Sequence, residues 1–103
     1  MNRTRQQKRQ AATVDLRREA AYRDCQIRVA PNCAEGTVLC HWRQLGISGL
    51  GIKAPDALAA WGCSACHALV DAADENDHAL RLDFAKAIFR TQAILIREGK
   101  IQW

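Results

Sequence analysis

Two pairs of cysteines are the residues whose types and spacing point most directly to chemistry. Cys63 and Cys66 have two residues between them, and Cys25 and Cys33, further upstream, have seven. Four thiolates in two pairs can complete the tetrahedral coordination of one zinc ion, and the close pair can reach that ion from the first turn of a helix. We therefore expect a structural Zn²⁺ on these four sulfurs, with the upstream pair forming an enlarged zinc knuckle.

Two other kinds of site use the same cysteines. The run Cys63-Ser-Ala-Cys66-His67 matches the attachment pattern of a c-type haem, and a Cys-x2-Cys pair can act as a redox dithiol. Haem attachment needs export, but the basic N-terminus leads into polar residues and shows no apolar stretch of a signal peptide. A redox dithiol leaves the upstream pair unexplained. In a cytoplasmic protein, where disulfides are rare, five cysteines favour metal binding or reactive thiols.

His67 and Asp71 follow the close cysteine pair and are four residues apart. On a helix that begins near Ser64, side chains at this spacing project from one face, one turn apart. An imidazole and a carboxylate can hold a divalent cation and leave coordination positions open for a substrate. We expect this second metal to serve chemistry, whereas the zinc serves folding.

The chain that must position these residues has 103 residues, enough for one domain with a modest core. Residues 1–12 are expected to form a flexible basic arm, and residues 13–103 a single zinc-containing domain. Asp56 is expected to cap a helical turn over 57–60, and Trp61 to lie half-buried beside the zinc. The other predicted elements are strands over 25–29 and 37–42, a helix over 14–22 capped by Thr13, and helices over 64–73 and 78–98.

The helix over 78–98 is predicted to carry two apolar stripes on nearly opposite faces. The first consists of Leu80, Phe84, Ala87, Ile88, Thr91 and Leu95. The second consists of Leu82, Ala85, Phe89, Ala93 and Ile96. One stripe is expected to pack on the core. The other is covered either by the N-terminal helix of the same chain or by a second copy or another protein, and the sequence favours neither.

Charge is distributed unevenly along this chain of net charge +4. Residues 1–53 carry ten Lys/Arg and four Asp/Glu, whereas residues 54–80 carry five acidic residues and no Lys or Arg. Cation binding in the middle with phosphate binding around it would produce this pattern, and so would an uneven solvated surface. The candidate nucleic-acid contacts are the basic residues outside the acidic centre: Arg3, Arg5, Lys8, Arg9, Arg17, Arg18 and Lys53. No apolar run approaches the length of a membrane span.

The order of these motifs resembles that of the treble-clef HNH endonucleases, which share a ββα-metal core. A cysteine knuckle is followed by a strand that ends in His41 and then by the Cys-x2-Cys-His helix. Leu39-Cys-His41-Trp-Arg43, the Gly-Ile-Lys-Ala-Pro-Asp56 loop, Trp61-Gly-Cys-Ser-Ala-Cys-His67 and Arg90-Thr-Gln…Gly99-Lys100 look like segments of small phage and prophage nuclease-domain proteins. The resemblance implies an α+β fold, in which a zinc-stapled treble clef is flanked by an N-terminal helix and a long C-terminal helix.

The resemblance also implies roles for individual residues. His41 would be the general base, at the end of the first strand of a β-hairpin, and Arg43 on the same strand face would contact the phosphate. His67 and Asp71 would hold the catalytic divalent ion, Mg²⁺ or Mn²⁺, with Zn²⁺ or Ni²⁺ as alternatives. The substrate would be DNA, and the protein would act in the cytoplasm of a bacterial host cell.

The sequence departs from the family pattern at two positions. Cys40 stands where an acidic residue often precedes the base, and Leu58 lies near the position of the motif asparagine. Asp56 is the nearest polar residue and a possible further metal ligand. The main alternative function is therefore a non-catalytic zinc module that binds DNA or a protein, in which His41 and His67 only pack. A thiol-redox protein is a third possibility, and it would carry no stoichiometric zinc.

Overall fold

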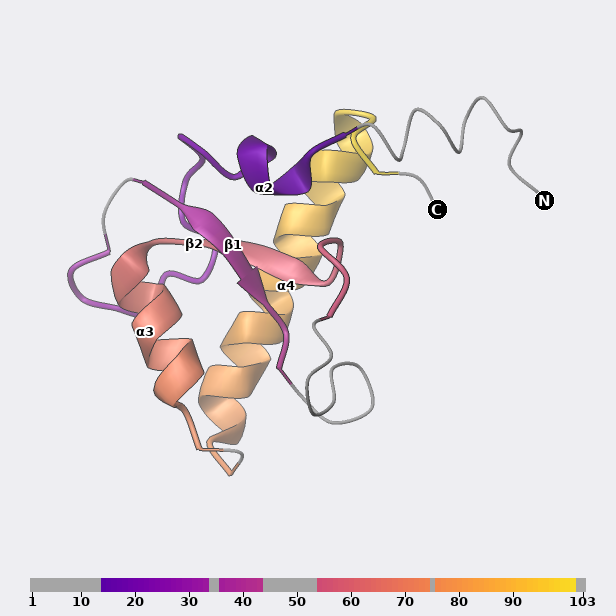
Figure 1. The fold of residues 1–103 in the computed structure, drawn as a ribbon. Helices are drawn as coiled ribbons and strands as arrows, with labels where there is room; N and C mark the ends of the chain where they lie inside the picture. The colour runs from indigo at the N-terminus through magenta and orange to yellow at the C-terminus, as the bar shows by residue number, and fades with distance from the viewer. Residues whose placement is uncertain (1–13, 34–35, 44–53, 75, 102–103) are drawn as a thin grey trace.

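A computed structural model describes residues 14–33, 36–43, 54–74 and 76–101 and shows a small α+β fold (Figure 1). Two short strands pair antiparallel, a helix follows the second strand directly, and a long helix packs along the sheet. The elements in chain order are α2 (Leu16–Glu19), β1 (Val38–His41), β2 (Ala59–Gly62), α3 (Ser64–Ala72) and α4 (His78–Arg97). The α+β class predicted from the sequence is confirmed, as are the strand near 37–42 and the two longer helices.

Strand β2 is buried over its whole length and holds the other elements together. It pairs with β1 from Val38 opposite Gly62 to His41 opposite Ala59. On its other edge the Trp61 carbonyl accepts a hydrogen bond from the Gln26 N–H at 2.7 Å. The Trp61 N–H donates to Thr91 Oγ1 of α4 at 3.1 Å. Both faces and both edges of β2 are therefore occupied by protein.

Small residues in β2 permit this close approach. A Cβ atom at Gly62 would lie 2.8 Å from the Cys40 sulfur and 2.5 Å from Ile27 Cδ1, inside their van der Waals contact distances. Ala59 and Ala60 are likewise fully buried. The helical turn expected over 57–60 is wrong, because Ala59 and Ala60 belong to β2. Alanine has the highest helix propensity, but helix propensity is a weak preference, and burial between β1 and α4 outweighs it here.

The structure corrects two further expectations about local structure. Residues 25–29 form no strand, because Arg28 has a positive φ of 57° that interrupts the extended backbone. The N-terminal helix α2 is shorter than predicted: Asp15 caps it by accepting from the N–H groups of Arg17 and Arg18. Thr13 and the expected arm over 1–12 lie outside the described residues.

Trp61 is 2% exposed, not half-buried, and it packs with Ala20 and Leu95 rather than with the cysteines. The Arg23 guanidinium lies 4.6 Å from the centre of its ring. Arg23 also forms two 2.7 Å hydrogen bonds with the Glu98 carboxylate, and these tie the segment after α2 to the end of α4. The core thus has two parts, one around Trp61 and one around the cysteines.

The two apolar stripes of α4 differ in burial. Phe84, Ala87, Ile88, Thr91 and Leu95 of the first stripe are buried, as predicted. In the second stripe Leu82, Phe89 and Ile96 are 55%, 67% and 37% exposed. Within the ranges that the structure describes, α2 included, no segment covers this second stripe. Contact with a second copy or another protein therefore stays a prediction. In the same ranges, no helix has the length and apolar character needed to cross a bilayer.

Two phenylalanines on opposite faces of α4 provide a matched test of this arrangement. Phe84→Ala should lower the free energy of unfolding by about 3–5 kcal/mol, because it empties a buried site beside the Trp42 ring. Phe89→Ala should change it by less than about 0.5 kcal/mol, because the side chain is exposed. Urea titration measures both values.

Light scattering extends the same test to self-association. Should the second stripe bind a second copy, wild type will exceed the monomer mass, and Phe89→Glu will become a folded monomer. A monomeric wild type together with an unfolded Phe89→Glu would instead identify the stripe as internal core.

Candidate metal centre and active site

The four cysteines expected to bind zinc converge at the start of α3. Their sulfurs lie within 4.8 Å of one another. Cys33 Sγ is 3.6 Å from Cys63 Sγ and 3.9 Å from Cys66 Sγ. Sulfurs bound at the usual Zn–S length of ~2.3 Å stand about 3.8 Å apart on the edges of a tetrahedron. The donor set, Cys25 included, therefore fits one zinc ion in both chemistry and spacing.

Backbone N–H groups of the surrounding loop and helix support these sulfurs. Cys63 is the N-cap of α3, and its sulfur accepts from the Cys66 N–H at 3.4 Å. The Ala30 N–H, from the loop between Cys25 and Cys33, donates to the Cys66 sulfur at 3.4 Å. Such donors stabilise negative charge on sulfur. The loop and the helix start are thus already joined through the ligands.

Burial and hydrogen bonding shift the pKa values of the sulfurs in different directions. The hydrogen bond with Cys25, and then burial, raises the pKa of Cys33. Burial raises the pKa of Cys66. Burial also acts to raise the pKa of Cys25, but hydrogen bonds with the backbone of Arg28 and Cys63 and with the thiols of Cys33 and Cys66 together outweigh it and lower that pKa. A divalent cation would let all four ionise, because it supplies the positive charge that the sulfurs lack.

Cys40, the fifth cysteine, has a different environment. It is fully buried in β1 and lies outside the four-sulfur group. Burial, and then the negative charge of Asp71, raises the pKa of Cys40 to about 12. Cys40 therefore stays a neutral thiol and serves as a core residue.

His41 ends β1 and lies beside a carboxylate from the turn before β2. Its Nε2 is 2.7 Å from Asp56 Oδ1. The same oxygen is 3.7 Å from Nε of Arg17, which belongs to α2. A shallow groove between α2 and β1 opens at these side chains, and its lining residues are Arg17, Ala21, Thr37, Val38, Leu39 and His41. Three elements far apart in the sequence thus meet at the end of β1.

His67 and Asp71 form a second pair, on α3. His67 Nε2 is 3.1 Å from Asp71 Oδ2, as their i, i+4 spacing predicted. The other oxygen, Asp71 Oδ1, is 3.6 Å from Nε of Arg43, two residues beyond His41. A cavity of about 80 Å³ beside this contact is lined by Arg43, Asp71 and Arg81, among others. Asp71 therefore connects α3 to the end of β1.

The structure brings some of the predicted site residues together and leaves others apart. Among the residues that the structure describes, the four cysteines are the one group of three or more possible ligands that lie close enough to share an ion. His67 and Asp71 could supply two ligands, and neither His41 nor Asp56 lies close enough to make a group of three with them. Arg18 is exposed on α2, whereas Arg3, Arg5, Lys8, Arg9 and Lys53 lie outside the described residues.

Sequence reasoning did not predict the contact of Asp56 with His41 and Arg17. It assigned Asp56 to a metal and Arg17 to phosphate, each on its own. No local pattern signals this contact, because it depends on how α2, β1 and the turn before β2 pack together.

Comparisons with known proteins place the chain in a family. The family described as "Putative nuclease YbcO" matches residues 14–100. The chain is 40% identical over 96 residues to the "Putative nuclease YbcO" of Escherichia coli (strain K12), with 85% of this chain and 97% of that protein covered. A protein of the same name from Enterobacteria phage 82 matches with the same identity and coverage. The chain belongs to the YbcO family.

A solved structure supports the fold of this YbcO family member. It is described as a "putative bacteriophage protein from Escherichia coli str. K-12 substr. MG1655", and it is 30% identical to this chain with a TM-score of 0.64. The match covers 82% of this chain and all of the solved chain. The sequence resemblance to small phage and prophage nuclease proteins is thereby confirmed, while membership of the wider HNH superfamily stays a prediction.

The zinc centre can be tested by metal analysis and circular dichroism. Purified wild type should hold one zinc per chain, and Cys63→Ser should fail to fold, because metal binding and folding are coupled in such sites. Cys40→Ala is the matched control and should keep its zinc, because Cys40 is not among the four sulfurs. Folded wild type without zinc, or with Cys25 and Cys33 joined in a disulfide, would rule the zinc centre out.

Proposed function

We propose that this protein is a metal-dependent DNA endonuclease of the HNH type, from a phage or prophage, that hydrolyses phosphodiester bonds in the host cytoplasm. One arrangement carries the proposal: His41 ends the first strand of the β1–β2 hairpin, and Asp71 of the next helix contacts Arg43, two residues beyond His41. This is the order that a ββα-metal core requires. The names of the YbcO relatives, which call them nucleases, agree with it.

His41 suits the role of general base in the hydrolysis. Its imidazole lies at the end of the groove between α2 and β1, and its side chain is 17% exposed. The ring is therefore held by protein but reachable by a phosphodiester and a water molecule. Hydrolysis requires a group that takes the proton of the attacking water, and histidine is the side chain best suited to do so near neutral pH.

His67 and Asp71 are the proposed ligands of the catalytic ion. A divalent ion bound there, Mg²⁺ or Mn²⁺, with Zn²⁺ or Ni²⁺ as alternatives, would act as a Lewis acid on the phosphate. Arg43 would contact the same phosphate. Its side chain is 71% exposed and its ion pair with Asp71 is long at 3.6 Å, so little free energy is lost when it turns to another anion.

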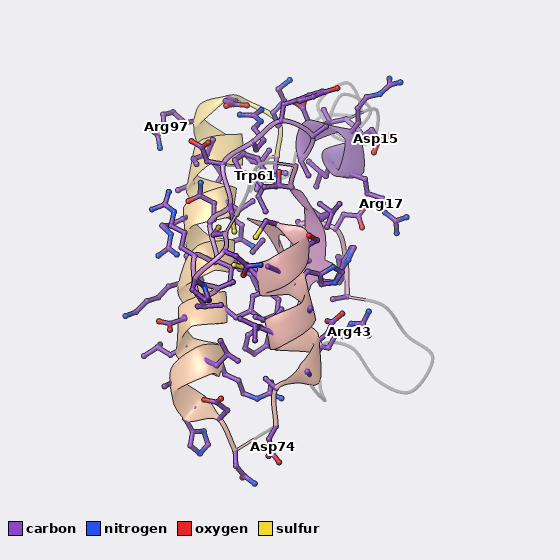
Figure 2. The ribbon with its side chains drawn as sticks, turned by 90° about the vertical axis from the view of Figure 1, so that its left-hand side faces the viewer. Asp15, Arg17, Arg43, Trp61, Asp74 and Arg97 are labelled. Atoms are coloured by element: carbon purple, nitrogen blue, oxygen red, sulfur yellow. The ribbon has the colours of Figure 1, made fainter. Side chains whose placement is uncertain are left out.

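Basic side chains are proposed to bind the DNA backbone around this site. Figure 2 shows Arg17 and Arg43 projecting toward the same side of the molecule, with Arg97 on the opposite side. Arg18 is exposed on the same helix as Arg17. The basic arm over residues 1–12 and Lys53 would add contacts to phosphate. The treble-clef core would hold this surface in place, because a bound zinc would fix the start of α3.

One observation favours the alternative of a non-catalytic zinc module. Apart from the cysteines, His67 and Asp71 are two ligands without a third nearby in the portion of the chain that is described. A chain that had lost its catalytic ion would still keep the zinc, the fold and the basic surface. Cleavage assays separate the two functions.

Plasmid nicking tests the role of His41. With Mg²⁺ or Mn²⁺ present, His41→Ala should slow nicking by on the order of 10²–10⁴-fold, because the general base is lost. Zinc content and DNA affinity should stay at wild-type values. His78→Ala is the matched control, since His78 is exposed at the start of α4. Nicking by His41→Ala at the wild-type rate would show that the mechanism is wrong.

The salt dependence of DNA binding tests the proposed interface. Affinity should fall steeply with salt, because Lys and Arg contacts to phosphate release counterions. Deleting residues 1–10, or replacing Arg17 with Gln, should make the slope of log affinity against log salt shallower by about one per lost contact. Arg97→Gln on the opposite side should leave it unchanged. Affinity that does not respond to salt would exclude this electrostatic interface.

A further inference from the structure

Backbone hydrogen bonds fix Asp56 beside His41. The Trp42 N–H donates to the Leu58 carbonyl at 3.0 Å, which continues the β1–β2 pairing past its last strand residue. The Leu58 N–H donates to the Pro55 carbonyl at 2.8 Å and closes a turn around Asp56. The 2.7 Å contact between Asp56 Oδ1 and His41 Nε2 therefore joins two side chains whose backbones are already in place. Little conformational entropy is lost in forming it.

The chemistry of the two groups decides which ring nitrogen carries the proton. A carboxylate only accepts hydrogen bonds, so Nε2 of His41 must be the donor. A neutral imidazole has a single N–H, and Nδ1 is then the nitrogen with a free lone pair. A carboxylate paired with a histidine in this way sets the tautomer and the orientation of the ring, while the other nitrogen moves the proton.

Arg17 of α2 also approaches the Asp56 carboxylate. Its Nε lies 3.7 Å from the same Asp56 oxygen, and both side chains are partly exposed, at 58% and 41%. An ion pair this long and exposed contributes little to stability. It nevertheless brings a cation of α2 to the same carboxylate oxygen that meets His41.

We propose that Asp56 is a positioning residue, whose carboxylate holds His41 in the Nε2–H tautomer so that Nδ1 faces the water to be deprotonated. This replaces the ligand role expected from the sequence, since Asp56 joins no group of ligand atoms among the described residues. The inference rests on the proposed function of His41 as general base. It gives the turn before β2 the role of positioning the general base, which the HNH motif did not predict.

Nitrogen NMR of the histidine rings tests the positioning without any activity. Long-range ¹H–¹⁵N spectra of zinc-loaded wild type should show the neutral His41 ring as the Nε2–H tautomer. Asp56→Asn should give a mixture of tautomers, because an amide can donate as well as accept. The His78 ring, which is remote from Asp56 in the sequence and exposed, serves as the internal control.

Kinetics provide the second measurement. Asp56→Asn should lower kcat by on the order of 10²-fold, with KM, zinc content and melting temperature close to wild type. Asp56→Glu should recover part of kcat, because it restores a carboxylate. An equal fall in kcat for Asn and Glu, or a fall that only accompanies unfolding, would contradict positioning.

The two measurements can contradict the positioning role and the nuclease function separately. A His41 tautomer that Asp56→Asn leaves unchanged would overturn the positioning role whatever the nuclease activity. A tautomer that Asp56→Asn disturbs, in a wild type that cuts no DNA, would support the positioning contact and overturn the proposed nuclease function alone.

Discussion

Four cysteine sulfurs within 4.8 Å of one another impose the constraint on which the rest of the site depends. Sulfurs this close cannot all carry negative charge without a cation among them, because like charges at such short distances repel one another. A zinc ion bound to them would fasten the loop over 25–33 to the first turn of α3. The helix would then start at a fixed point. On its first two turns His67 and Asp71 pair with each other, and Asp71 also contacts Arg43 beyond the end of β1.

The buried strand β2 supplies the second part of the framework. Its small residues let β1, the loop containing Gln26 and helix α4 all contact it, and this leaves no room for a larger side chain at Gly62. Because the strand is so enclosed, the turn that precedes it is held in place, and Asp56 meets His41 there. The buried core is thus bordered by partly exposed side chains, among them His41 and Asp56, whose groups suit phosphodiester chemistry.

How much of this follows from the sequence depends on whether the cause is local. The spacing of Cys63 and Cys66, the i, i+4 relation of His67 and Asp71 and the buried stripe of α4 are local patterns, and the structure bears them out. The run Ala59-Ala60 carries no period, so nothing in it distinguishes a strand from a helical turn. The contacts of Asp56 with His41 and Arg17 depend on the packing of three separate elements, and no local sequence pattern predicts that packing.

In the proposed function, this YbcO family member hydrolyses DNA with His41 as the base and a divalent ion at His67 and Asp71. The most direct measurement is cleavage of DNA by zinc-loaded wild type in water enriched in ¹⁸O, with added Mg²⁺ or Mn²⁺. We expect strand breaks that require the added ion, and a terminal phosphate that carries one ¹⁸O atom from solvent. The contradicting result is a folded protein that binds the DNA tightly but leaves it intact with each of Mg²⁺, Mn²⁺, Zn²⁺ and Ni²⁺. That result would identify a non-catalytic zinc module.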